Sequence, residues 1–213
     1  CRARVNAMHD APREALRRVF GYSAFRGRQE EVIRHVAAGG SGLVLMPTGG
    51  GKSLCFQVPA LCRPGIGIVV SPLIALMEDQ VAALRQQGVA ASALHSDLPP
   101  DEARAVLRDL HQGTLQLLYV SPERLTLETM LARLDGLDIA LFAVDEAHCI
   151  SQWGYDFRPA YLEIATIRAY HPKVNVLALT ASATPEVEKD ILEKLQLKKP
   201  ATFHQSFARK NLS

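Results

Sequence analysis

The chain has 213 residues, of which 48% are hydrophobic and 22% are charged. These values are typical of a globular protein and exclude disordered, collagen-like and coiled-coil chains. The 24 basic and 22 acidic residues nearly balance, so the net charge alone does not indicate a nucleic-acid partner. A chain of this length is expected to form one domain.

Membrane insertion and secretion are not expected. The longest apolar run, Ile139 to Val144, is far shorter than the roughly 20 residues that cross a bilayer. No charged-then-apolar signal segment opens the chain. The four cysteines form no Cys-x-x-Cys pair and no cluster with zinc spacing, which predicts reduced thiols and no structural metal. We therefore expect a location in the cytoplasm, or in the nucleus of a eukaryote.

Short apolar runs alternate with amphipathic stretches along the chain. Runs rich in Val, Ile and Leu are typical of strands that are buried on both faces of a parallel sheet. We expect strands at 42–46, 65–70, 92–95, 115–120, 139–144 and 174–179. We expect helices at 28–38, 73–87, 100–112, 122–134, 159–170 and 185–195. This alternation predicts one α/β domain, with a mostly parallel sheet and helices on both faces.

In such a sheet, ligands bind in the loops at the carboxyl ends of the strands. After the first predicted strand, residues 46–53 read Met-Pro-Thr-Gly-Gly-Gly-Lys-Ser. Successive glycines allow backbone N–H groups to surround a phosphate at a helix start. Lys52 would reach the β- and γ-phosphates, and the Ser53 hydroxyl would hold Mg²⁺. Met46 replaces the first glycine of the usual pattern, and a plain glycine-rich turn is the alternative.

Two carboxylates, Asp145 and Glu146, follow the fifth predicted strand. Asp145 would complete a Mg²⁺ site opposite the phosphate loop. Glu146 would polarise the water that attacks the γ-phosphate. The alternative is that both carboxylates form the solvated cap of the next helix.

The two motifs together resemble those of superfamily 2 helicases. The string from Asp145 to Pro159, Asp-Glu-Ala-His-Cys-Ile-Ser-Gln-Trp-Gly-Tyr-Asp-Phe-Arg-Pro, is similar to the RecQ family of DNA helicases in particular. Further matching strings lie at 20–29, 70–80, 119–125 and 179–185. The resemblance implies a RecA-like P-loop NTPase fold for residues 1–213, with 1–40 as an N-terminal helical segment that carries the adenine-reading motif. It also implies ATP and Mg²⁺ as ligands.

The resemblance assigns roles in nucleotide binding and coupling. Residues Thr48, Gly49, Gly50 and Gly51 would belong to the phosphate cradle with Lys52 and Ser53. Gln29 matches the glutamine that reads adenine, and Tyr22 and Arg26 match residues that pack near the base; without the resemblance, Gln29 is an ordinary residue of an exposed helix. Ser182 and Thr184 match the motif that couples hydrolysis to movement, although Thr184-Pro185 is equally compatible with a helix start.

Other positions match the DNA side of the family. Ser71-Pro72 and Ser121-Pro122 match loops that touch the DNA backbone, although as bare turns they would mean little. His148 matches a residue that links the nucleotide state to the DNA state; the alternative is a histidine with satisfied hydrogen bonds beside the loop.

An aromatic-rich segment, residues 149–161, contains Trp153, Tyr155, Phe157 and Tyr161, together with Arg158. Exposed aromatic rings stack on bases of single-stranded nucleic acid at roughly 1–3 kcal/mol per base. Composition alone favours a hydrophobic mini-core, whereas the resemblance implies the loop that senses DNA. Tyr155 departs from the family pattern, because many relatives carry histidine there.

The resemblance implies an ATP-dependent DNA helicase that acts on single-stranded and duplex DNA. We expect this chain to be its first motor domain, with the second motor domain, its arginine finger and the accessory domains lying outside it. Residues 206–212 resemble the lead into that second domain. Two alternatives stay open: an isolated nucleotide-dependent nucleic-acid-binding module, or an RNA-directed relative in superfamily 2.

Overall fold

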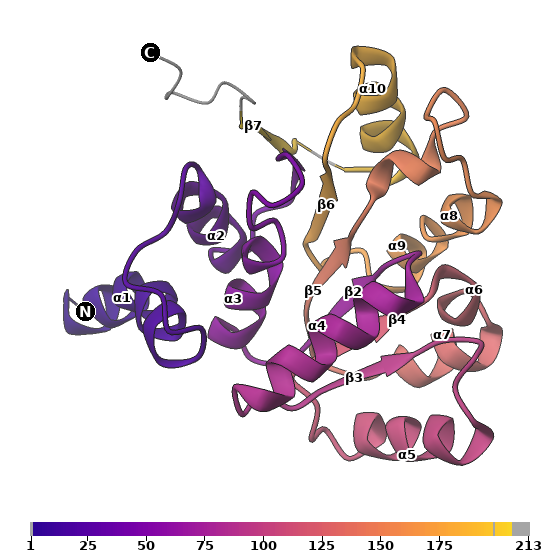
Figure 1. Cartoon of the computed structure of the whole chain (residues 1–213), viewed down its shortest axis with the longest axis horizontal. Helices are drawn as coiled ribbons and strands as arrows, with labels where there is room; N and C mark the ends of the chain where they lie inside the picture. The colour runs from indigo at the N-terminus through magenta and orange to yellow at the C-terminus, as the bar shows by residue number, and fades with distance from the viewer. Residues whose placement is uncertain (1, 198, 206–213) are drawn as a thin grey trace.

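Seven parallel strands form a single sheet in the order β3-β4-β2-β5-β6-β1-β7 (Figure 1). The structure is a computed structural model that describes residues 2–197 and 199–205, so the predicted lead at 206–212 lies outside the described residues. The strands are β1 (Gly42–Leu45), β2 (Ile66–Val70), β3 (Ala91–Leu94), β4 (Leu117–Val120), β5 (Ile139–Val144), β6 (Val176–Thr180) and β7 (Ala201–His204).

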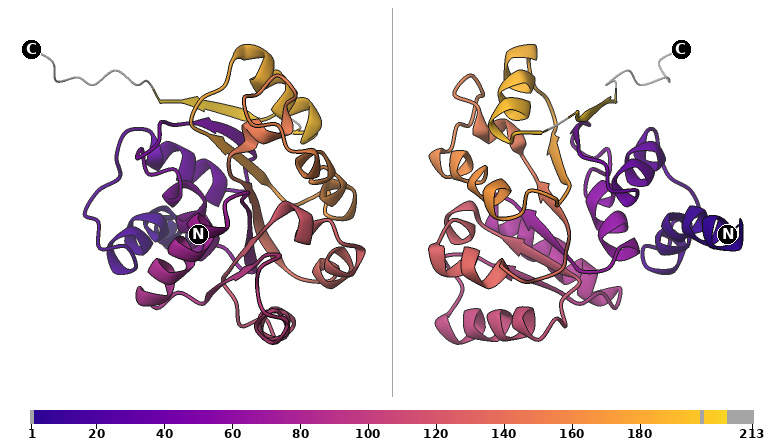
Figure 2. Two further views of the ribbon diagram at one scale, coloured as in Figure 1. Left: turned by 45° about the vertical axis from the view of Figure 1, so that its right-hand side comes forward. Right: turned by 180° about the vertical axis from the view of Figure 1, so that it is seen from behind.

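Helices cover both faces of this sheet (Figure 2). One face carries α2 (Gln29–Ala37), α3 (Leu54–Cys62) and α4 (Ile74–Gln86), and α1 (Arg2–Arg18) packs on α2 and α3. The other carries α5 (Pro100–His111), α6 (Pro122–Leu125), α7 (Glu128–Leu134), α8 (Pro159–Glu163), α9 (Thr166–Tyr170) and α10 (Pro185–Lys194). A short 3₁₀ helix, η1 (Ala147–Ile150), follows β5. Within the described part of the chain, none of the helices is long and apolar enough to cross a membrane.

The strands are apolar throughout because each of their faces is covered. Successive side chains of a strand point to opposite faces. In β2, Ile68 belongs to the core on the side of α5 to α10 and Val69 to the core on the side of α2 to α4, and both are fully buried. The predicted α/β class, with a parallel sheet between two helix layers, is therefore confirmed.

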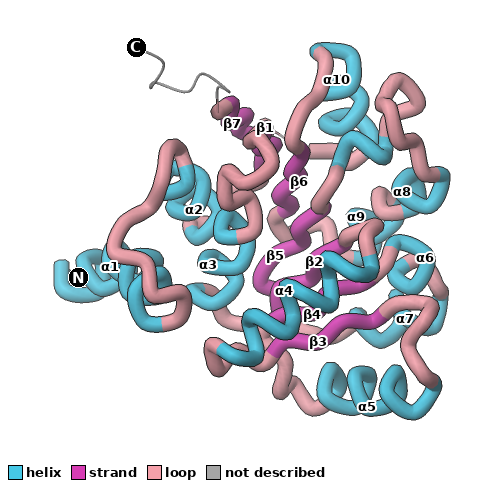
Figure 3. The backbone as a smooth tube through the Cα atoms, in the orientation of Figure 1, coloured by secondary structure: helices cyan, strands magenta, loops and turns pink. Residues whose placement is uncertain are grey.

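The structure differs from the sequence-based expectations in several elements, and α3 is one helix that the expected set did not include. The helix expected at 122–134 is two helices, α6 and α7, and the Thr126 hydroxyl between them donates to the Pro122 carbonyl. The helix expected at 159–170 is likewise divided into α8 and α9. Strand β7 was not predicted. It lies beside β1 at the edge of the described sheet (Figure 3). Within β7 only Phe203 is buried, so the strand lacks an apolar run.

Candidate active site

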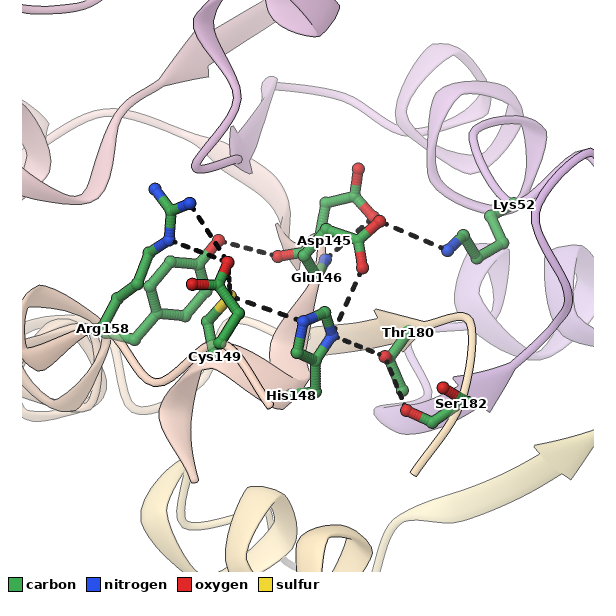
Figure 4. Close-up of polar contacts among 10 residues, drawn as sticks. Lys52, Asp145, Glu146, His148, Cys149, Arg158, Thr180 and Ser182 are labelled. Atoms are coloured by element: carbon green, nitrogen blue, oxygen red, sulfur yellow. Dashed lines mark hydrogen bonds and ion pairs between the residues drawn. The ribbon is translucent and has the colours of Figure 1, made fainter. Parts of the chain in front are cut away.

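The predicted phosphate loop and the acidic pair meet at the carboxyl edge of the sheet. The loop follows β1 and Asp145 follows β5, and β6 lies between these two strands. Lys52 Nζ lies 3.6 Å from Glu146 Oε1 (Figure 4). The topology thus brings together two charged groups from distant parts of the sequence, as expected where ligands bind in open α/β sheets.

Backbone conformation explains the glycines of the loop. Gly49 and Gly51 have φ angles of +80° and +75°, a region that side chains rarely adopt. A Cβ on Gly50 would lie 2.8 Å from the Pro47 carbonyl oxygen. Helix α3 begins directly after Ser53, whose hydroxyl makes no capping hydrogen bond within the described residues. The loop therefore closes tightly on the start of a helix, where N–H groups favour an anion.

Gln29 supports this loop from the N-terminal segment. Its side chain is 2% exposed. Gln29 Oε1 accepts a hydrogen bond from the Arg26 N–H at 2.8 Å, and Nε2 donates to the carbonyls of Gly50 and Gly51 at 3.3 and 3.2 Å. A Cβ on Gly51 would lie 2.2 Å from Gln29 Nε2. The interpretation of Gln29 as an ordinary residue of an exposed helix is therefore wrong.

A pocket lies beside the loop and unites the predicted base-reading residues with the glycines. It is lined by Tyr22, Ala24, Arg26, Gln29, Gly49, Gly50, Gly51 and Leu54. The Tyr22 side chain is 48% exposed, so its ring is accessible to a ligand. The pocket therefore joins an aromatic ring and polar side chains to the glycine loop, a mixture of groups common in ligand pockets.

Glu146 stands in a strained turn. Its φ and ψ angles are 47° and 44°, the left-handed region that non-glycine residues avoid. Its backbone N–H donates to Asp145 Oδ1 at 3.0 Å. The turn directs the Glu146 carboxylate toward Lys52 on one side and His148 on the other, whose Nδ1 lies 3.3 Å from Oε2 (Figure 4).

The environment shifts the pKa values of Asp145 and Glu146 in opposite directions. Burial raises the pKa of Asp145 to about 6; the neighbouring charge of Glu146 adds to this rise, and Lys52 opposes it. The hydrogen bond from His148 lowers the pKa of Glu146, and Lys52 lowers it further. Adjacent carboxyl groups with separated pKa values are typical of acid–base sites.

His148 links this acidic pair to the segment after β6. It is 3% exposed, and its Nδ1 lies 2.9 Å from Thr180 Oγ1. The Thr180 hydroxyl donates to the Ser182 carbonyl at 3.2 Å, so the hydroxyl oxygen accepts from Nδ1. This arrangement places a proton on Nδ1.

Thr184 is the N-cap of α10, because its hydroxyl accepts a hydrogen bond from the Val187 N–H at 3.4 Å. This agrees with the helix start that was the alternative interpretation of Thr184. Ser182 contributes its backbone carbonyl to the Thr180 contact. The coupling role of the two residues stays a prediction.

The aromatic segment is divided between surface and core. Trp153 and Tyr155 are 77% and 75% exposed, and the Tyr155 ring stacks on His148 with centroids 4.3 Å apart. Tyr161 is fully buried and donates to the Asp145 carbonyl at 2.9 Å, while Phe157 is half-buried. The mini-core interpretation is thus wrong for Trp153 and Tyr155 and correct for Tyr161.

Arg158 joins the aromatic segment to the loop after β2. Its guanidinium pairs with Asp156 at 3.1 Å and donates to the Pro72 carbonyl at 3.3 Å. Ser71 and Ser121 follow the neighbouring strands β2 and β4 and are 2% and 3% exposed. Among the residues described, neither hydroxyl has a hydrogen-bond partner. Buried polar groups are usually paired, so both hydroxyls are candidates to contact a ligand.

Sequence reasoning missed His95, which follows β3 at the same edge. It is 2% exposed, and its Nε2 lies 3.3 Å from Glu78 Oε1. His95 is the last residue of the strand expected at 92–95, whereas β3 ends at Leu94.

Comparisons with known proteins agree with this geometry. Residues 26–191 match the DEAD/DEAH box helicase family. The chain is 48% identical over 200 residues to the ATP-dependent DNA helicase RecQ of Bacillus subtilis, covering 93% of this chain and 34% of that protein. It is 45% identical over 199 residues to the RecQ helicase of Pasteurella multocida, covering 93% and 32%. The chain spans about a third of the length of these relatives. The resemblance to the RecQ family is confirmed.

Solved structures share the fold at low sequence identity. A hypothetical ATP-dependent RNA helicase from Sulfolobus tokodaii superimposes with a TM-score of 0.69 at 18% identity, covering 94% of this chain and 57% of that one. The DUF1998 helicase MrfA bound to DNA gives 0.71 at 18% identity, covering 92% and 29%.

Proposed function

Because this chain belongs to the DEAD/DEAH box helicase family, we propose that it is the first, ATP-binding motor domain of an ATP-dependent DNA helicase of RecQ type. The observation that carries the proposal is the meeting of Lys52 and Glu146 at the carboxyl edge of the sheet, beside the pocket that Gln29 lines. The RecQ similarity supports DNA as the nucleic acid, rather than RNA.

Nucleotide binding would use the loop and the pocket together. Gln29 lines the pocket, and its amide would exchange its present contacts to Arg26, Gly50 and Gly51 for hydrogen bonds with the edge of an adenine. Tyr22 and Arg26 would pack near the base. Lys52 would neutralise phosphate charge. The oxygen donors of Ser53 and Asp145 suit Mg²⁺, which prefers oxygen ligands and, when bound, neutralises charge on the phosphates.

Glu146 would act as the general base. Its lowered pKa keeps the carboxylate ionised at neutral pH, so it can accept a proton from an attacking water. His148 holds Oε2, which fixes the orientation of the carboxylate. Tyr161 supports the same turn through the Asp145 carbonyl.

Single-stranded DNA would contact the exposed side of the same edge. The Trp153 ring is free to stack on a base, and Phe157 and Arg158 lie in the same segment. The Ser71 and Ser121 hydroxyls would donate to backbone phosphates after a shift of the loops that bury them. Tyr155 stacks on His148, and His148 contacts Glu146. A shift of the aromatic segment would therefore change the contact between His148 and Glu146. We propose that this contact, with Ser182 and Thr184 beyond Thr180, couples DNA to hydrolysis.

The second motor domain would be the partner that completes the site. An arginine supplied across a cleft is worth about 10³–10⁵ in rate in P-loop enzymes. We therefore expect weak ATP binding, slow turnover and little or no unwinding from these 213 residues alone. A motor of this kind would work where ATP and DNA occur together, in the cytoplasm of a bacterium or the nucleus of a eukaryote.

ATP turnover by the 213-residue chain, measured without nucleic acid, with single-stranded DNA and with RNA of the same sequence, tests the proposal. Slow turnover that rises with DNA more than with RNA supports the helicase motor. Nucleotide-dependent DNA binding with no turnover favours the isolated binding module. Greater stimulation by RNA favours an RNA-directed relative.

A further inference from the structure

A second cluster of potential ligands lies at Nε2 of His148, the ring nitrogen that does not contact Glu146 (Figure 4). Cys149 Sγ lies 3.7 Å from His148 Nε2 and 3.8 Å from Asp156 Oδ2, and the three ligand atoms lie within 4.8 Å of one another. We propose that these three side chains bind a divalent transition-metal ion of the zinc type, at a site separate from the proposed Mg²⁺ ligands.

The spacing of the three atoms suits tetrahedral coordination. Zinc–sulfur bonds of about 2.3 Å and zinc–nitrogen bonds of about 2.0–2.1 Å place neighbouring ligand atoms about 3.6 Å apart. The two measured distances from Sγ are already close to this value. The Asp156 side chain is 45% exposed and can move to close the third edge. Three protein ligands leave the fourth position for water.

Outer contacts orient two of the three ligands. A histidine that binds a metal usually donates its other ring N–H to an oxygen acceptor, and a ligating carboxylate is usually hydrogen-bonded in turn. His148 Nδ1 contacts Thr180 Oγ1 and Glu146 Oε2, and Nε2 is directed toward Cys149. Arg158 donates to Asp156 Oδ2 from Nε and Nη2 at 3.2 and 3.1 Å. Coordination would use the neutral imidazole with its proton on Nδ1, the nitrogen that faces the two oxygens.

The donor set selects the ion. Thiolate and imidazole favour zinc-type metals, whereas Mg²⁺ prefers the oxygen donors of Ser53 and Asp145. His148 and Cys149 are 3% and 0% exposed, so the donors lie in the wall of the domain rather than on a flexible surface. Sequence spacing gave no sign of this site, because the third ligand comes from the turn that brings Asp156 back toward η1.

The effect of the ion rests on the proposed function. A metal would tether Asp156 to His148 and so restrain the segment that carries Trp153, directly beside Glu146. We expect the loaded protein to respond less to single-stranded DNA. Metal binding itself does not depend on this consequence, so it is measured first.

Cobalt spectroscopy tests the site independently of ATP hydrolysis. Co²⁺ is titrated into the 213-residue chain, with Cys1 replaced by serine in every protein so that it contributes no thiolate. The variants are Cys149→Ser and Asp156→Asn, and Cys62→Ser is the matched control on α3. Circular dichroism and a melting curve establish that each variant is folded.

We expect the parent and Cys62→Ser to bind one equivalent of Co²⁺, with a thiolate charge-transfer band and the visible bands of a tetrahedral site, and Zn²⁺ to displace it. Cys149→Ser should lose the charge-transfer band, and Asp156→Asn should weaken binding at least about tenfold. Absence of the bands in the folded parent, or their persistence in Cys149→Ser, would overturn the proposal. Either result leaves the ATP-binding proposal intact, because Lys52 and Ser53 take no part.

Discussion

Lys52 Nζ lies 3.6 Å from Glu146 Oε1, although the two residues follow β1 and β5, which β6 separates in the sheet. Lys52 lowers the pKa of Glu146, as does the hydrogen bond from His148. Capture of a phosphate by Lys52 would draw the ammonium away from the carboxylate and leave His148 as its remaining partner. The ion pair thus connects the proposed phosphate cradle directly to the proposed general base.

Glu146→Gln should retain nucleotide binding and lose hydrolysis. The amide keeps the shape of the side chain but cannot accept a proton, and general-base catalysis is worth about 10²–10⁴ in rate. Turnover is measured in a protein that also contains the second motor domain, and nucleotide affinity is measured by titration. Glu193→Gln, an exposed change on α10, serves as the control. Hydrolysis by Glu146→Gln at the parental rate would show that Glu146 is not the base.

Asp145→Asn should stabilise the fold at pH 8. Burial raises the folded-state pKa of Asp145 from 3.8 to about 6, so the folded protein carries an unfavourable carboxylate above that pH. The penalty is absent below the unfolded-state pKa of 3.8, grows between that pH and about 6, and is constant above it, on the order of 1–3 kcal/mol. Urea denaturation at pH 5 and pH 8 should give the larger gain at pH 8.

Asp190→Asn is the control, and we expect it to change the free energy of unfolding in the opposite direction. Hydrogen bonds from Ser151 and Lys194 lower the pKa of Asp190, so its carboxylate stabilises the fold at pH 8 and the substitution should cost stability there. An Asp145→Asn protein that is no more stable than the parent at pH 8 would contradict the conclusion that the buried Asp145 carboxylate destabilises the fold.

Trp153→Ala should remove stimulation by DNA without affecting the fold. The ring is 77% exposed, so its loss should change the free energy of unfolding by no more than about 0.5 kcal/mol. A lost base stack weakens DNA binding by about 1–3 kcal/mol. ATPase with and without single-stranded DNA is measured beside a melting curve, in the protein with both motor domains. Tyr170→Ala, which removes a 58% exposed ring on α9, is the control.

A collapsed melting temperature with an unchanged stimulation ratio would refute the sensor role of Trp153. The reverse pattern, a preserved melting temperature and basal rate with the stimulation lost, is the expected one.

Gln29→Ala should weaken ATP binding and abolish the preference for ATP over GTP. The buried amide holds the Gly50 and Gly51 carbonyls and faces the base pocket, so its removal loses both the loop support and the base contact. A buried hydrogen-bonding group discriminates strongly between ligands. Competition titrations with ATP and GTP measure the ratio, and Gln112→Ala, an exposed glutamine after α5, is the control. An unchanged ratio would exclude Gln29 as the adenine reader.

The sheet was predictable because its strands are apolar on both faces, as Ile68 and Val69 illustrate. Strand β7 was not predictable, because an edge strand with one buried side chain has no run of apolar residues. At the division between α6 and α7, the Thr126 hydroxyl donates to the Pro122 carbonyl, a local contact that periodicity does not report.

The charged residues of the site were predictable from their places after strands, but their interactions were not. The His148 contact to Thr180 requires β6 beside β5, and the Lys52 contact to Glu146 requires β1 on the other side of β6. No sequence pattern specifies this strand order. The exposure of Trp153 beside the burial of Tyr161 likewise depends on the turn after η1.

The most direct test of the account is the affinity of the 213-residue chain for a fluorescent ATP analogue with Mg²⁺, compared among the parent, Lys52→Ala and Lys189→Ala. Lys189 is an exposed lysine of α10 that pairs with Glu193, so it controls for the loss of one positive charge. Hydrogen bonds to charged groups contribute about 1.5–3 kcal/mol each. We predict saturable binding by the parent and Lys189→Ala, and at least about a tenfold loss in Lys52→Ala. Equal affinity in all three folded proteins would contradict the assignment of residues 46–53 as a triphosphate cradle.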